Sequence, residues 1–130
     1  VAQLKIATKF HFTGFLRGDD VQKMFLYSDV YVMPSVSEPF GISPLEAMRA
    51  GVPTIISKQS GVAEVLKHSI KIDYWDIDAM ADAMYALCTY PGLHEYLQVE
   101  GKKEVDGITW EKVGQRIRKL YDETIQKCKY

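Results

Sequence analysis

The middle of the chain contains an apolar run, Val30-Tyr31-Val32-Met33, followed by Glu38-Pro39-Phe40-Gly41-Ile42-Ser43-Pro44-Leu45-Glu46. The run predicts a buried strand of a parallel sheet. The second segment ends with the spacing of a helix start: Ser43 as the cap, Pro44 in the first turn and Glu46 three residues after the cap. Open α/β sheets bind ligands at the carboxyl ends of their strands, so this connection is the expected place for chemistry.

Strands and helices alternate on both sides of this connection. Turn residues and helix-start residues separate the apolar runs, and each connection is only a few residues long. The expected strands are residues 10–14, 30–33, 53–57 and 70–73, and the expected helices begin at Asp19, Ser43 and Gly61, with the last one covering 61–67. This alternation predicts an α/β fold with a parallel, doubly wound sheet.

The last third of the chain is predicted to be helical only. Asp76 is a cap residue for an amphipathic segment that the pair Pro91-Gly92 interrupts. A second helix is expected from Leu93, and a third begins at Thr109. We expect the third helix to bury a stripe made of Trp110, Val113, Ile117, Leu120, Tyr121 and Ile125.

Composition narrows the classes of function. The 130 residues are 47% hydrophobic and 25% charged with a net charge of -1, which predicts one globular domain over residues 1–130 and no nucleic-acid or anionic-membrane partner. Cys88 and Cys128 have no metal-ligand spacing, so we expect reduced thiols, no metal site and a cytoplasmic protein. No apolar segment reaches the roughly 20 residues needed to cross a bilayer. The chain lacks an initial Met, so we expect a piece of something longer.

Several motifs together resemble one enzyme family. The resemblance extends over nearly the whole chain and is specific because the paired glutamates lie between a Pro-Ser strand end and a Glu-Ala-Met helix. The matching segments are residues 12–15, 27–35, 38–48, 51–56 and 61–65, together with Trp110. They resemble the carboxyl-terminal donor-binding domain of retaining GT-B glycosyltransferases of group 1, which include glycogen and starch synthases. The implied fold is Rossmann-like with a helical carboxyl terminus.

The resemblance implies roles for the two glutamates and the residues between them. Glu38 would face hydroxyls of the transferred sugar as the catalytic-site carboxylate, and Glu46 would accept hydrogen bonds from the two ribose hydroxyls. Ionised carboxylates suit both tasks because they offer several acceptor sites to vicinal diols. The donor sugar and diphosphate would be bound by Phe40, Gly41, Ile42, Ser43 and Leu45, largely through backbone amides.

The nucleotide base would lie near residues after the first strand. The resemblance implies that Phe15, Leu16 and Arg17 border it. The donor would be a UDP-, ADP- or GDP-sugar, with glucose as the favoured sugar, and no obligatory metal or other cofactor is expected. The sequence does not identify the nucleotide base of the donor or the acceptor.

Each candidate also has a structural explanation. Glu46 occupies the capping-box position of Ser43, and both roles can coexist. Glu38 would otherwise be a solvated loop charge, Arg17 a surface charge and Phe15 a core residue. We expect no catalytic base among the histidines, since His11 lies in a predicted strand and His68 and His94 lack evident partners.

The family pattern is incomplete in this chain. An acceptor domain and two strand-helix units that carry basic residues for the diphosphate are not found, so the isolated chain is expected to be inactive while its parent is an enzyme. The first and second predicted strands would then expose unpaired edges. We expect either a strand contact with another chain across this gap or re-pairing of the first strand.

Three hypotheses follow from the sequence. The first is the donor half-site of a retaining hexosyltransferase, and the second is a non-catalytic nucleotide-sugar-binding or structural piece. The third, a receiver-like signalling domain, fits the alternation of elements but lacks the acidic metal cluster that such a domain needs.

Overall fold

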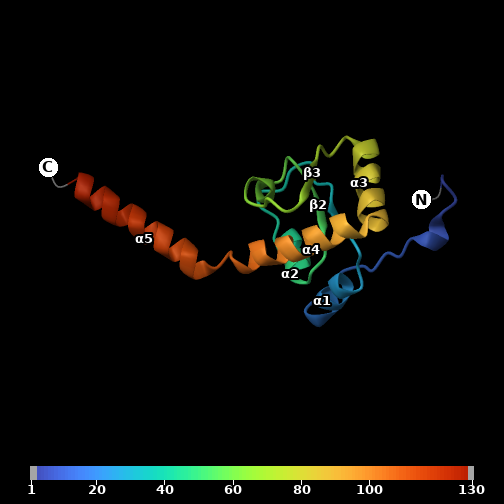
Figure 1. The fold of residues 1–130 in the computed structure, drawn as a ribbon, viewed down its shortest axis with the longest axis horizontal. Coiled ribbons are helices and arrows are strands. Elements are labelled where there is room, and N and C mark those ends of the chain that lie inside the picture. The colour runs from blue at the N-terminus through green and yellow to red at the C-terminus, as the bar shows by residue number, and fades with distance from the viewer. Residues whose placement is uncertain (1–2, 129–130) are drawn as a thin grey trace.

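The computed structural model describes residues 3–128 and has a three-stranded parallel sheet in the order β1-β2-β3 (Figure 1). The strands are β1 (Tyr31–Met33), β2 (Thr54–Ser57) and β3 (Ile70–Ile72). The central strand β2 is buried at all four positions, as expected of a parallel strand covered on both faces. Three of the four predicted strands are therefore confirmed, as is the α/β class.

Helices cover both faces of this sheet. They are α1 (Asp19–Leu26), α2 (Ser43–Arg49), α3 (Ile77–Thr89), α4 (Pro91–Asp106) and α5 (Trp110–Lys127), with short 3-10 helices η1 (Ala7–Lys9) and η2 (Gly61–Glu64). The predicted cap Asp76 forms and accepts from the Ala79 amide at 3.0 Å. Thr109, at which a helix was expected to begin, also caps its helix and accepts from the Lys112 amide at 3.4 Å. The helix expected over 61–67 is shorter than predicted.

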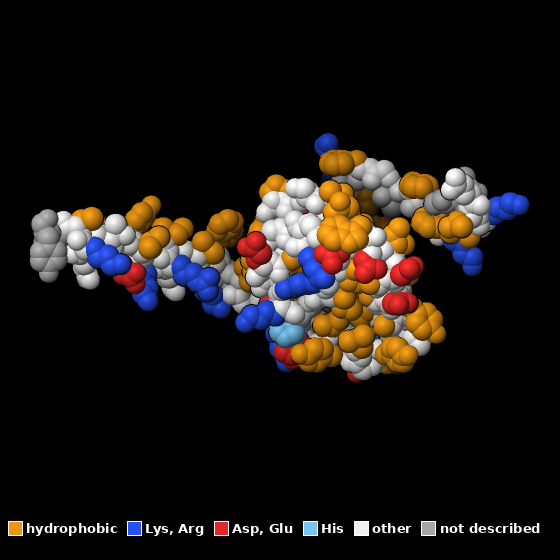
Figure 2. Space-filling model, turned by 90° about the horizontal axis from the view of Figure 1, so that it is seen from above, with side chains coloured by type: hydrophobic (Ala, Val, Ile, Leu, Met, Phe, Trp, Pro, Cys, Tyr) orange, Lys and Arg blue, Asp and Glu red, His pale blue; other side chains and the backbone are white. Residues whose placement is uncertain are grey.

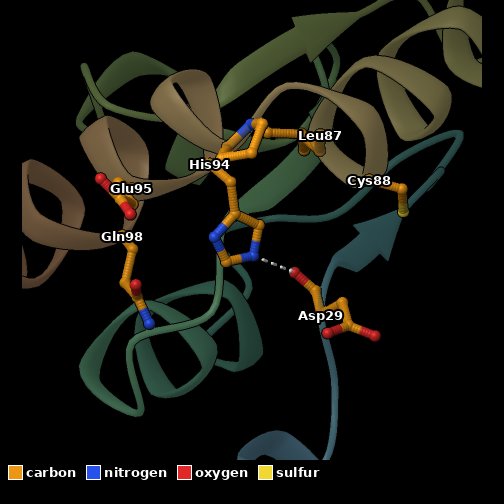
Figure 3. Close-up of a pocket in the computed structure, with 7 residues that line it drawn as sticks. Asp29, Leu87, Cys88, His94, Glu95 and Gln98 are labelled. Atoms are coloured by element: carbon orange, nitrogen blue, oxygen red, sulfur yellow. Dashed lines mark hydrogen bonds between the residues drawn. The ribbon is translucent and has the colours of Figure 1, made fainter.

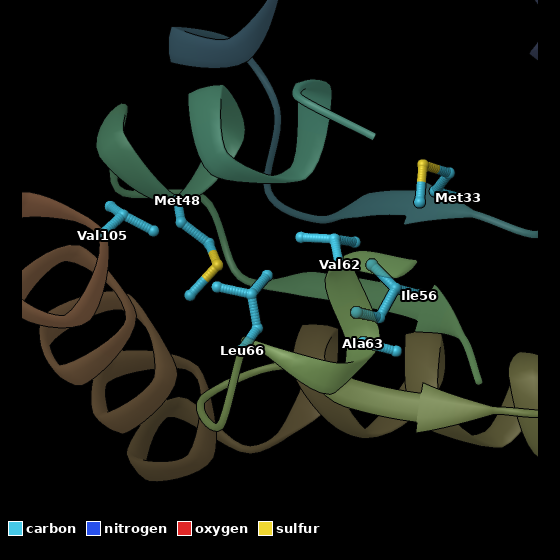
Figure 4. Packing of buried hydrophobic residues seen from close by; sticks show 7 residues of the cluster. All are labelled: Met33, Met48, Ile56, Val62, Ala63, Leu66 and Val105. Carbon is cyan, nitrogen blue, oxygen red and sulfur yellow. The ribbon is translucent and has the colours of Figure 1, made fainter. Parts of the chain in front are cut away.

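The core has two main clusters because neighbouring residues of a strand point to opposite faces. Ile56 belongs to the cluster under α2 and η2, which Figure 4 shows, and Ile55 belongs to the cluster under α3. Helix α4 contributes to both, through Val105 and Leu97 respectively. Helix α4 therefore joins the two layers.

Residues 10–14 do not form the predicted strand. They have no regular structure, and Phe12 is 83% exposed. The segment Phe10-His11-Phe12-Thr13-Gly14 has no neighbouring strand with which to share hydrogen bonds, so its composition alone does not make it a strand. Re-pairing of this segment within the chain is therefore wrong, whereas β1 is an edge strand as expected. Strand contact with another chain stays a prediction.

Helix α5 forms where it was predicted but buries nothing. It projects away from the sheet (Figure 1), and none of its described residues is buried. The space-filling view shows apolar side chains along this projection (Figure 2). The expectation of a buried stripe was wrong because periodicity shows which face of a helix is apolar and not what covers it. Among residues 3–128, no helix is long and apolar enough to span a bilayer.

Candidate functional site

The connection between β1 and α2 lies at the carboxyl end of the sheet and is held in place by backbone hydrogen bonds. The Gly61 amide donates to the Glu38 carbonyl and the Val62 amide donates to the Phe40 carbonyl, both at 2.9 Å. A Cβ on Gly61 would lie only 2.0 Å from the Pro39 carbonyl oxygen. Glycine at 61 therefore permits this close approach of η2 to the connection.

The turn itself depends on Gly41. Its φ is +86°, a left-handed conformation that favours glycine. The turn is not enclosed in the core, because Phe40 and Ile42 on either side of Gly41 are exposed. The segment is thus rigidly placed and accessible to a ligand.

Four consecutive amides of the turn have no acceptor. Within residues 3–128, neither a carbonyl nor a side chain accepts a hydrogen bond from the backbone N–H groups of residues 40–43. The carbonyls of Glu38 and Phe40, in contrast, are bonded to η2. The turn therefore has spare donors, which suit an anion or the hydroxyl oxygens of a sugar.

Glu38 and Glu46 lie on the same side of the domain. Both side chains are half-buried, and both carboxylates are close enough to the Tyr31 hydroxyl to raise its pKa. Burial is the largest cause of that raised pKa, and a hydrogen bond with Ser43 opposes it. Within the described residues, neither carboxylate accepts a hydrogen bond. The two predicted carboxylates thus share a site and have free acceptor oxygens.

The predicted capping box does not form. Ile42 occupies the cap position, Ser43 is the first residue of α2, and no side chain caps the helix. The Ser43 Oγ instead lies 2.7 Å from the hydroxyl of Tyr31. A contact distant in sequence therefore replaces the local one, and the structural explanation of Glu46 as a capping residue is wrong.

Two of the three residues predicted to border the base line a groove of about 340 Å³. Phe15 and Leu16 contribute to it, as does Tyr31. Arg17 lies outside its lining but places its guanidinium 5.0 Å from the centre of the Phe15 ring. The remaining lining residues are Thr13, Gly14, Val21, Met24, Phe25 and Ser28. Tyr31, which no sequence motif marks as a site residue, connects this groove with Ser43.

A larger cavity, of about 490 Å³, lies elsewhere, between α3, α4 and Asp29. In Figure 3 the ring of His94 points toward the Asp29 backbone, and its Nε2 is 3.1 Å from the Asp29 carbonyl oxygen. His68 also has a partner, with its Nδ1 2.9 Å from Glu104. The expectation that these histidines lack partners was wrong. In the described part of the chain, no group of three or more His, Cys, Asp or Glu residues could hold a metal ion.

Comparison with known proteins identifies a family. A sequence model described as "Glycosyl transferases group 1" matches residues 1–104. The chain is 35% identical over 124 residues to an uncharacterized glycosyltransferase of Methanocaldococcus jannaschii, covering 92% of this chain and 32% of that protein. It is 25% identical over 126 residues to mannosylfructose-phosphate synthase of Agrobacterium fabrum, covering 94% and 28%. The chain thus spans about a third of the length of these relatives.

Solved structures show the same fold. Sucrose-phosphate synthase from Thermosynechococcus elongatus matches with a TM-score of 0.79 and 24% identity, over 97% of this chain and 33% of that one. Anabaena HepE, solved in complex with UDP-glucose, matches with a TM-score of 0.80 and 17% identity, over 94% and 34%. The likeness extends through nearly all of this chain.

Proposed function

This chain belongs to the group 1 glycosyl transferases, and we propose that it forms the donor-binding half of a retaining hexosyltransferase. The donor is a nucleoside diphosphate sugar, with glucose as the favoured sugar, and binding needs no metal. The site is the turn between β1 and α2 together with the adjoining groove. The free carboxylate of Glu46 is the single observation that most supports this proposal, because no helix cap accounts for it.

The two glutamates bind different hydroxyls in this proposal. Glu46 accepts hydrogen bonds from the two ribose hydroxyls, and Glu38 accepts them from the transferred sugar at the reacting end. Both carboxylates are half-buried and lack an intramolecular donor within residues 3–128. A carboxylate in this condition recovers the hydrogen bonds lost on desolvation when a diol binds.

The turn supplies donors to the diphosphate and the sugar. The amides of Phe40, Gly41, Ile42 and Ser43 lack acceptors, and Leu45 follows them in the first turn of α2. Negative charge grows on the nucleoside diphosphate as it leaves, so donors already in place stabilise that step. In the groove, Phe15 and Leu16 border the base, while Arg17 lies over the Phe15 ring.

The preference for ribonucleotides over 2′-deoxyribonucleotides tests whether Glu46 binds the ribose hydroxyls. We expect Glu46→Ala to bind UDP, ADP or GDP about 10- to 100-fold more weakly, the effect of losing hydrogen bonds to a charged group. The wild-type chain should prefer each ribonucleotide over its 2′-deoxy form, and Glu46→Ala should lose that preference. Isothermal titration calorimetry measures both. Glu95→Ala, an exposed glutamate on α4, is the matched control.

A purely structural role for Glu46 predicts another pattern. Both nucleotide forms would then bind more weakly by the same factor, and the preference for ribose would persist. Unchanged affinity in Glu46→Ala, with the fold retained by circular dichroism, would also contradict the assignment.

The chain covers only about a third of the length of its relatives, and this supports a second candidate function. In it, the chain binds the donor without transferring sugar by itself. The relatives are about three times as long as this chain. We expect the 130-residue chain to bind a nucleotide sugar without releasing the nucleoside diphosphate, whereas the full-length parent releases it when an acceptor is present. The anomeric configuration of the parent's product, determined by NMR, tests whether transfer proceeds with retention.

A further inference from the structure

Tyr31 connects the two parts of the candidate site. It is the first residue of β1, and its side chain forms part of the wall of the groove that Phe15 and Leu16 also border. Its ring meets the Phe25 ring edge to face, with centroids 5.7 Å apart. Its hydroxyl lies 2.7 Å from the Ser43 Oγ. One side chain thus extends from the base side of the site to the turn that carries the free amides.

Which of the two hydroxyls donates to the other determines whether Ser43 can donate its own hydrogen to a ligand. Either oxygen can be the donor in this hydrogen bond. A hydroxyl has one hydrogen and two acceptor sites, so Ser43 can donate to a ligand only if its oxygen accepts from Tyr31 or stays unpaired. An anion beside Ser43 favours the arrangement in which Tyr31 donates to Ser43 and Ser43 donates to the anion, because consecutive hydrogen bonds polarise one another.

The surroundings keep the Tyr31 phenol protonated. Burial raises its pKa above the ordinary value of 10.0, and the charges of Glu38 and Glu46 raise it further, against the opposing effect of the Ser43 hydrogen bond. The proton that Tyr31 must donate is therefore held at neutral pH.

We infer that Tyr31 is a positioning residue for the donor diphosphate: its hydroxyl donates to Ser43, which in turn donates its own proton to a phosphate oxygen. This inference rests on the proposed function. It adds a side-chain contact to the backbone amides of the turn, and it assigns the contact to a pair of hydroxyls that are 12 positions apart in the sequence.

Two single variants and their combination test the pair. We expect Tyr31→Phe and Ser43→Ala each to weaken the binding of UDP, ADP or GDP by about 2- to 10-fold, the effect of one hydrogen bond. The double variant should bind no more weakly than Ser43→Ala alone, because Tyr31 acts through Ser43. Binding of the corresponding nucleosides, followed by NMR titration, should be unchanged because they carry no phosphate. Tyr27→Phe, at an exposed tyrosine outside the groove lining, is the control.

The outcomes separate this inference from the proposed function. If the wild-type chain binds none of the nucleoside diphosphates, the proposed function is wrong and this inference is wrong with it. If the wild type binds but Tyr31→Phe binds equally well, or loses nucleoside and diphosphate affinity alike, only the role of Tyr31 is wrong. If Tyr31→Phe does not fold, the test rests on Ser43→Ala. This variant must then bind nucleoside diphosphates more weakly while it binds nucleosides as the wild type does, and any other result overturns the inference.

Discussion

Glu104 shows how one residue of α4 secures the turn before β3. Its carboxylate accepts hydrogen bonds from the Lys67 amide at 2.8 Å and from the His68 amide and Nδ1 at 2.9 Å each. The side chain is 14% exposed. Burial by itself raises the pKa of Glu104, but these hydrogen bonds outweigh it and hold the pKa below the ordinary 4.5. The folded state thus favours the ionised carboxylate.

We expect Glu104→Gln to lower the free energy of unfolding by about 1–3 kcal/mol at neutral pH, because an amide cannot accept from all three donors. The folded-state pKa lies below the unfolded one, so this stabilisation is present above pH 4.5 and is lost as the pH falls through the folded-state value. Urea denaturation at pH 7 and at successively lower pH measures the difference between variant and wild type. A difference that stays constant on acidification would contradict the argument.

The left-handed backbone conformation at Gly41 makes this position sensitive to substitution. Alanine there must adopt a φ of +86° and place its Cβ 3.1 Å from the Glu38 Cγ. We expect Gly41→Ala to cost about 1–3 kcal/mol of stability and to weaken nucleotide binding, since the turn must change to relieve the strain. Gly92→Ala is the control, because nothing lies within 4 Å of its added Cβ. Equal stability of the two variants would contradict a strained position 41.

At the scale of elements, η2 and the turn form one unit. The backbones of Glu38 and Ser60 pair in an isolated parallel bridge, and the hydrogen bonds from Gly61 and Val62 extend it. Helix η2 in turn packs through Val62 and Ala63 into the core. The position of the turn is therefore set by packing of an element that follows β2.

We expect Gly61→Ala to displace the turn, because its Cβ would meet the Pro39 backbone and no flexible side chain can yield there. The cost should be about 1–3 kcal/mol of stability, typical of overpacking, with weaker nucleotide binding as well. Thermal denaturation and calorimetry measure the two effects. Glu64→Ala, at an exposed position of the same 3-10 helix, should leave both nearly unchanged. Normal nucleotide affinity in Gly61→Ala would show that η2 does not position the turn.

The sequence predicts elements well where the signal is local. Each of β1, β2 and β3 contains at least two Ile, Val or Met residues, and Asp76 and Thr109 cap the helices that follow them. Sequence-based prediction fails where a residue distant in the sequence contributes a contact. The Ser43 side chain, for example, forms a hydrogen bond with the Tyr31 hydroxyl instead of capping α2. The paired glutamates and the base-side segment were found from a family pattern, whereas no local pattern marks Tyr31.

At the scale of the whole molecule, α5 stands apart from the packed layers (Figure 1). Trp110 is 87% exposed, and Leu120 and Tyr121 are also exposed. The amphipathic pattern predicted this helix but contained no information on its neighbours. The open edge of β1 was likewise predicted from the sequence without information on what pairs with it. Sedimentation velocity at increasing protein concentration would test the predicted contact between chains.

We expect the double variant Ile117→Ser with Leu120→Ser to leave the free energy of unfolding of the sheet domain unchanged, because neither side chain lies in the core. Leu87→Ala is the comparison, since it removes a buried side chain and should cost about 2–5 kcal/mol. Guanidinium denaturation followed by circular dichroism measures both. A loss in the double variant close to that of Leu87→Ala would show that α5 folds back onto the domain.

The bonding of the turn has a consequence for engineering. The carbonyl oxygens of Glu38 and Phe40 are bonded to η2, whereas the N–H groups of residues 40–43 have no acceptor within residues 3–128, so these backbone amides present their positive polarity to a ligand. That polarity is a property of the main chain and does not depend on which side chains occupy 40 and 42. Both exposed positions can therefore be randomised to change the preferred sugar while affinity for the phosphates persists.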